Sequence, residues 1–154
     1  MASVTLTGGD GLEAKLKELA GKLGAKKREV RVGFFENAKY PDGTSVATIA
    51  AIQNFGAPSR GIPPRPFFSN MVAAKSPGWP DSFVRIMKAN EYDLDLSLNL
   101  LGGGIAGQLR QSIKDTNSPP LSPVTVRKKG FAKPLIDTAV MFQSVDFEVT
   151  GAGE

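Results

Sequence analysis

The residues Gly102-Gly-Gly-Ile-Ala-Gly107 have the glycine spacing of a turn that binds a pyrophosphate. Glycines in such a turn let the backbone approach phosphate oxygens at the start of a helix. The same chemistry requires a strand before the motif and, after it, a second strand with an acidic residue. A proline-rich break at Ser118 comes too soon for that unit. The alternative is a loosened or kinked point in a helix, since each interior glycine costs roughly 1 kcal/mol.

A second candidate for chemistry is Asp137, in the sequence Leu135-Ile-Asp-Thr-Ala139. This sequence resembles the active-site turn of retroviral-type aspartic proteases, in which paired carboxylates share a proton and activate water. Ala139 stands where those proteases have glycine, and the apolar-glycine segment that completes their fold is missing downstream. The residues therefore favour a structural cap, in which Asp137 accepts amide hydrogen bonds at the start of a short helix.

The composition excludes most other catalytic arrangements. The chain has no cysteine and no histidine, so thiolate nucleophiles, imidazole bases and the common zinc sites have no ligands to use. We expect no cofactor, no metal and no enzymatic activity. The 19 basic and 15 acidic residues give a net charge of +4, which permits non-specific proximity to DNA without predicting sequence-specific binding.

The length of 154 residues predicts a single domain spanning residues 1–154. No stretch approaches the roughly 20 apolar residues of a membrane span, and the first residues lack a charged-then-apolar signal. We expect a chain that is made and used without a membrane.

Hydrophobic periodicity predicts an α+β fold. Alternating apolar residues predict strands near residues 3–7, 29–35 and 144–149, which would form a small antiparallel or mixed sheet packed against several helices. Leucines at positions 12, 16, 19 and 23 predict an amphipathic helix that packs through its leucine stripe, with Asp10 as a possible cap and Gly24 at its end. Helical spacing then continues from Asp81 to Ile113. Alternation over residues 94–100 leaves a strand as the competing interpretation there.

The elements of residues 30–68 follow one another closely, and the rest of the chain is organised around them. A strand leads into a turn at residues 40–44, and a helix follows that Ser45 or Thr44 can cap and that Gly56 ends. Three prolines then restrict residues 62–68 to an extended, stiff arm.

This arm presents Ile62, Arg65, Phe67 and Phe68, which we predict to contact another subunit or a partner protein. Arginine and aromatic residues are the types that most often anchor interfaces. The alternative is an arm folded back onto its own core, because paired phenylalanines are commonly buried within one chain.

A proline-containing segment is followed by a short basic run, Arg127, Lys128 and Lys129. One interpretation is a solvated loop, because short charged runs commonly lie on the wet surface.

Three segments together resemble one family. They are VGFFENAKYPDGTSVATIAAIQNFGAP running into IPPRPFF, then PPLSPVTVRKKG, and finally KPLIDTAVMFQSVDFEV. In this order and spacing they resemble the tail-completion and head-tail joining proteins of long-tailed bacteriophages, over about residues 30–149. Ala139 departs from the family, which usually has glycine after Asp-Thr.

The resemblance implies a structural virion protein that catalyses nothing and forms a homo-oligomeric, commonly hexameric ring at the neck or the head-proximal end of the tail. Its partners would be other neck or tail proteins, and DNA would pass through its lumen. In such a ring, Arg127, Lys128 and Lys129 would be a loop that faces the lumen or an adjoining ring, as the alternative to a solvated loop. Its location would be the virion, after assembly in the host cytoplasm. The alternatives are a minor tail component or connector adaptor elsewhere in the neck and, in another class, an aspartic protease of the prohead.

Overall fold

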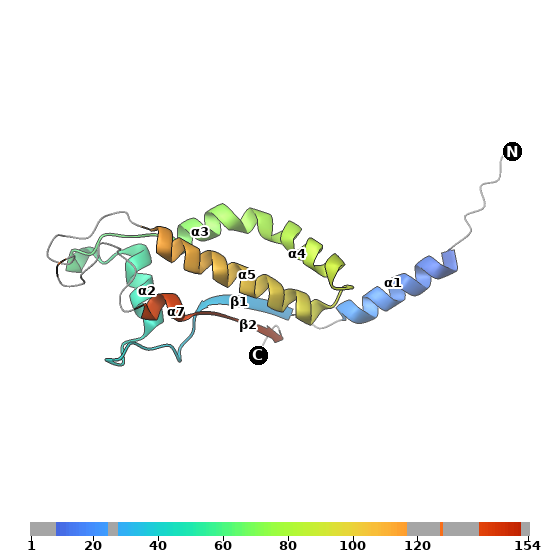
Figure 1. The fold of residues 1–154 in the computed structure, drawn as a ribbon, viewed down its shortest axis with the longest axis horizontal. Coiled ribbons are helices and arrows are strands. Elements are labelled where there is room, and N and C mark those ends of the chain that lie inside the picture. Colours follow the sequence, from blue (N-terminus) through green and yellow to red (C-terminus); the bar gives the residue numbers. More distant parts are fainter. Residues whose placement is uncertain (1–8, 25–27, 117–126, 128–138, 152–154) are drawn as a thin grey trace.

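A computed structural model of the chain describes residues 9–24, 28–116, 127 and 139–151. Helices and a two-stranded antiparallel sheet build an α+β fold, as predicted (Figure 1). The described elements are α1 (Gly9–Leu23), β1 (Arg28–Phe34), α2 (Val46–Phe55), α3 (Phe67–Lys75), α4 (Trp79–Ala89), α5 (Leu94–Asp115), α7 (Val140–Gln143) and β2 (Val145–Gly151), with 3-10 turns at Pro58–Arg60 and Ser76–Gly78.

The sheet has one apolar and one charged face. In the antiparallel register Val30 pairs with Val149 and Val32 with Phe147, so these side chains share the face that packs on α5. On the opposite face Arg31 forms ion pairs with Glu29 and Glu148. The strands predicted at residues 29–35 and 144–149 are confirmed to within two residues, whereas residues 3–7 lie outside the described part.

Helix α5 runs without interruption through the glycine motif. A strand does not precede the motif and a helix does not start there, so the pyrophosphate interpretation of Gly102–Gly107 is wrong. The motif lies inside a helix, as the alternative supposed, and the helix is continuous through it. Gly102 is buried beneath the sheet. A Cβ at this position would overlap the ring of Phe147 and lie 2.8 Å from Cγ2 of Val30. The missing side chain is therefore what lets the sheet approach α5 this closely.

The long helix predicted from Asp81 to Ile113 is in fact two helices. Residues Glu91 and Tyr92 have φ angles of 52° and 61°, which no helix accommodates. Asp93 then caps α5, its side chain accepting a hydrogen bond from the amide of Leu96 at 2.9 Å. The strand alternative for residues 94–100 is wrong, because this segment is helical. Asp93 was the available signal for the break.

Helices α3 and α4 are joined by a tight turn. Prolines occupy early positions of the 3-10 turn at Ser76–Gly78 and of α4, where a missing amide hydrogen costs no intrahelical bond. The indole Nε1 of Trp79 donates to Oε1 of Gln108 at 2.9 Å, which ties this junction to α5. The chain thus changes helix geometry between α3 and α4 without an intervening loop.

Helix α1 projects from the body (Figure 1). Gly24 ends it with a φ of 59°, and the Gly24 amide donates to the carbonyl of Ala20, as the sequence predicts. Asp10 lies within the helix and not before it. The predicted packing through the leucine stripe is wrong for Leu16, whose exposed fraction is 56%.

The core lies where α2, α3, α5, α7 and β2 meet. Its buried members are Val46, Ala50, Phe67, Met71, Ala106, Leu109, Ile113, Met141 and Val145. Helices α2 and α3, which form the site described next, are therefore anchored on the best-packed part of the described chain.

Candidate docking groove

The turn before α2 is built as the sequence predicts. The side chain of Asp42 accepts a hydrogen bond from the amide of Thr44 at 2.9 Å, and this bond lowers the pKa of the Asp42 carboxyl. Gly43 has a φ of 86°, which glycine adopts without steric cost. Ser45, and not Thr44, caps α2 by accepting from the amide of Thr48. These contacts fix the start of the helix.

The end of α2 depends on Gly56. Its φ of 76° and ψ of 173° lie in a region that is essentially restricted to glycine. A Cβ there would lie 2.8 Å from the backbone nitrogen of Pro64 and 2.9 Å from the carbonyl oxygen of Ile62. Ala57 and Ile62 exchange two backbone hydrogen bonds. The proline-rich segment is therefore held against the helix that it follows.

Asn54 joins the end of α2 to the start of α3. Its side chain is buried, and its Oδ1 accepts hydrogen bonds from the amides of Phe68 at 3.0 Å and Ser69 at 3.1 Å. Its Nδ2 donates to the hydroxyl of Ser69 at 2.8 Å. The first amides of a helix have no intrahelical partner, so Asn54 acts as an N-cap supplied by a neighbouring helix. It sets the angle and distance between α2 and α3.

The arm folds back onto its own chain. The amide of Arg65 donates to the carbonyl of Gln53 at 2.7 Å, and its Nη1 donates to Oε1 of Gln53 at 3.3 Å. Burial lowers the pKa of the Arg65 guanidinium. Phe67 is 1% exposed, and the Ser112 hydroxyl on α5 donates to its carbonyl. For Arg65 and Phe67 the structure thus shows the second of the two interpretations, in which the arm packs against the core of its own chain.

The predicted extent of the arm is also wrong at its end, because Phe67 and Phe68 form the first turn of α3. Phe68 and Ile62 are partly exposed. Contact of these two residues with a partner stays a prediction.

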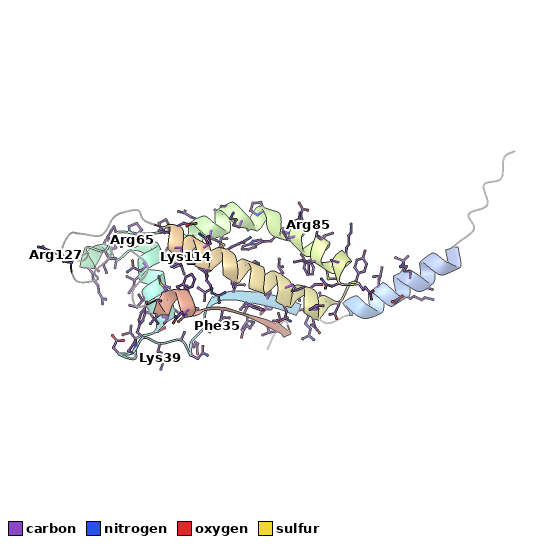
Figure 2. All side chains as sticks on the ribbon, in the orientation of Figure 1. Phe35, Lys39, Arg65, Arg85, Lys114 and Arg127 are labelled. Atoms are coloured by element: carbon purple, nitrogen blue, oxygen red, sulfur yellow. The ribbon has the colours of Figure 1, made fainter. Side chains whose placement is uncertain are left out.

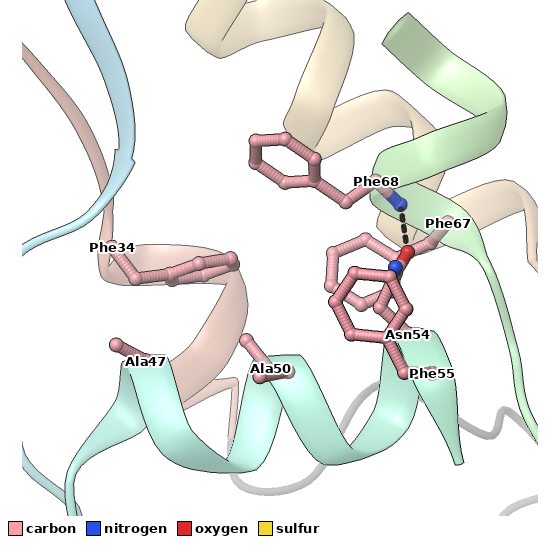
Figure 3. Close-up of a pocket in the computed structure, with 8 residues that line it drawn as sticks. Phe34, Ala47, Ala50, Asn54, Phe55, Phe67 and Phe68 are labelled. Atoms are coloured by element: carbon pink, nitrogen blue, oxygen red, sulfur yellow. Dashed lines mark hydrogen bonds between the residues drawn. The ribbon is translucent and has the colours of Figure 1, made fainter. Parts of the chain in front are cut away.

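Between β1, α2 and α3 lies an open apolar groove with a volume of about 230 Å³. Its lining residues are Phe34, Ala47, Ala50, Ala51, Asn54, Phe55, Phe67 and Phe68. Figure 3 shows the alanines of α2 along one side, with Phe34 facing Phe67 and Phe68 across the hollow. The rings of Phe34 and Phe67 meet edge to face, with centroids 6.3 Å apart. Phe55 is 73% exposed at the rim.

The lining of the groove is almost entirely apolar. None of its lining residues carries a titratable group. Asn54 is the one polar side chain in the lining, and both atoms of its amide already form hydrogen bonds. The volume is also below the roughly 300–1,000 Å³ of typical small-molecule pockets. An apolar side chain from a protein partner is the ligand that suits this groove best.

The basic run is only partly described. Arg127 is exposed, and Figure 2 shows it at the same end of the molecule as Arg65. Lys128, Lys129 and Asp137 lie outside the described residues. The contact of the basic run with a lumen and the capping role of Asp137 stay predictions.

Sequence reasoning missed several residues of the groove. Asn54 was not singled out, and its only sequence signal is its position two residues before Gly56, in the last turn of α2. Helical spacing puts Phe55 on one apolar face of α2 with Val46, Ile49 and Ile52, and only the tertiary arrangement shows that Phe55 is exposed.

Within the described ranges, the acidic residues do not gather into any group of three or more that could hold a metal ion. Of the described helices, none is both long and apolar enough to cross a membrane. A scan against protein-family models, a search of curated proteins and a search of solved structures each gave no match to this chain.

Proposed function

We propose that this chain is a structural virion protein of a long-tailed bacteriophage, which forms a hexameric ring at the head-tail junction or the head-proximal end of the tail. One observation carries the proposal. The segment with the most extensive resemblance to tail-completion proteins, residues 30–68, supplies every residue that lines the apolar groove. A groove without titratable side chains suits a docking protein that has no reaction to catalyse.

A second observation supports the resemblance. Ala139 has a φ of 61°, in the left-handed region that favours glycine. This is the position at which the resembling family usually has glycine. Glycine would fit this backbone conformation, so the departure at Ala139 does not count against the resemblance.

The experiment uses the phage that encodes the chain. A nonsense mutation in its gene should yield filled heads and separate tails, and supplying the protein in trans should restore joined particles. Quantitative mass spectrometry of purified virions should then find the protein at a fixed ratio to the portal. Joined, infectious particles that lack the protein would overturn the proposal, and so would turnover of a substrate by the purified chain.

A further inference from the structure

Helix α1 has an apolar surface that no other described element covers. Leu16 is 56% exposed and Leu19 is partly exposed. Among the described elements none packs along α1, which points away from the body (Figure 1). Helices of about 12–15 residues are marginal in water unless an apolar face is packed. We therefore expect the leucine stripe of α1 to pack against another apolar surface.

The α2–α3 groove has the form that accepts a helix. Ala47, Ala50, Ala51 and Asn54 follow the i, i+3, i+4, i+7 spacing of one helical face, and small side chains let an incoming helix approach closely. Phenylalanines border this face. Helix-in-groove recognition reads apolar anchors at the same spacing on the ligand helix. Leucines at positions 12, 16, 19 and 23 present that pattern.

These two surfaces lie at opposite ends of the molecule (Figure 1). In a single copy, α1 leaves the body at the Arg28 end of β1, whereas Phe34 at the other end of the strand borders the groove. A head-to-tail contact between copies would cover both. Such heterologous contacts repeat from copy to copy and form a ring when the rotation closes.

We propose that helix α1 of one copy docks its leucine stripe into the α2–α3 groove of the next copy. Leu16 and Leu19 enter the hollow, and the exposed ring of Phe55 covers them from the rim. This inference rests on the proposed ring, because it names the contact that joins the ring's subunits.

Disulfide trapping tests the contact directly, since the chain has no cysteine of its own. Full-length chains carrying Leu16→Cys and Ala51→Cys are mixed under a mild oxidant. Both positions are exposed, so each variant should fold. A disulfide forms only where the Cα atoms come within about 7 Å. The expected result is a cross-linked pair that contains one copy of each variant.

In the matched control, the Leu16→Cys chain is mixed with a Leu100→Cys chain and not with the Ala51→Cys chain. Leu100 is an exposed leucine on α5. This mixture should give no cross-link. A cross-link between positions 16 and 100, with none between positions 16 and 51, would place α1 on α5 and overturn the inference. A chain that carries both Leu16→Cys and Ala51→Cys could instead form only an intramolecular disulfide. That result would show that α1 occupies the groove of its own chain, and it would also overturn the inference. So would the absence of every cross-link.

A second measurement follows self-association of the full chain by analytical ultracentrifugation. Leu16→Glu should weaken association by about tenfold or more, because a charge replaces a leucine that becomes buried. Leu100→Glu should leave it unchanged. The two proposals fail separately. Virions that contain the protein but give no Leu16–Ala51 cross-link would refute only the docking mode, whereas virions without the protein would refute only the function.

Discussion

In the described part of the chain, small residues on a helix face aromatic rings at Gly102 of α5 and along α2, and the first of these two places is filled while the second is open. Gly102 of α5 lies directly beneath Phe147, with no room for even a Cβ. The alanines of α2 face Phe34 and Phe68 across an open hollow. The first arrangement joins the sheet to α5 within the chain. The second leaves apolar surface uncovered.

The largest expected effect on stability comes from adding a side chain at Gly102, where α5 packs against the sheet. Gly102→Ala should lower the free energy of unfolding by about 1–3 kcal/mol, because the added Cβ overlaps the Phe147 ring. Urea denaturation measures it. Gly104→Ala is the matched control, since that position has nothing within 4 Å, and should raise stability by up to about 1 kcal/mol. Equal stability of the two variants would mean that the sheet does not pack on Gly102.

A smaller loss of stability should come from replacing Asn54, which joins the two helices that border the groove. Asn54→Ala deletes the cap of α3 and should cost about 1–2 kcal/mol in urea denaturation. Asn54→Asp keeps an acceptor for the amides of Phe68 and Ser69 and should cost less. If both variants cost the same, the amide hydrogen bonds are not what joins α2 to α3.

Ala139 separates the effect of backbone conformation from that of neighbouring rings. Ala139→Gly should raise the free energy of unfolding by up to about 1 kcal/mol, because glycine adopts a φ of 61° without the cost that alanine pays. Ala89→Gly, at the end of α4, should be destabilising by comparison. A loss of stability at residue 139 would contradict the left-handed conformation.

The smallest effect is expected inside the groove itself. Ala51→Leu adds volume on an exposed part of α2, where there is space for it, so stability should change by no more than about 0.5 kcal/mol. Self-association should weaken nonetheless, because the larger side chain occupies the hollow. A loss of stability as large as that of Gly102→Ala would show that the groove is closed in solution.

The sequence predicted the features that depend on neighbouring residues. Alternating valines gave both described strands, and Ser45, Gly24 and Gly56 gave helix ends, because each effect acts within a few residues. Features that depend on distant residues were missed. Phe67 looks like part of an extended arm until Asn54 is seen to cap its helix. The pattern of Gly102 suggests phosphate binding until Phe147, which is far away in the chain, is placed above it.

The pairing of β1 with β2 also bears on how the protein is made. Phe34 lies next to Val145, so the sheet joins the first quarter of the described chain to its last residues. Contacts between such distant residues form slowly, because a long loop must close first. A ribosome has to release the chain through β2 before β1 can pair with it. Until then, the valines of β1 and the Gly102 face of α5 stay uncovered.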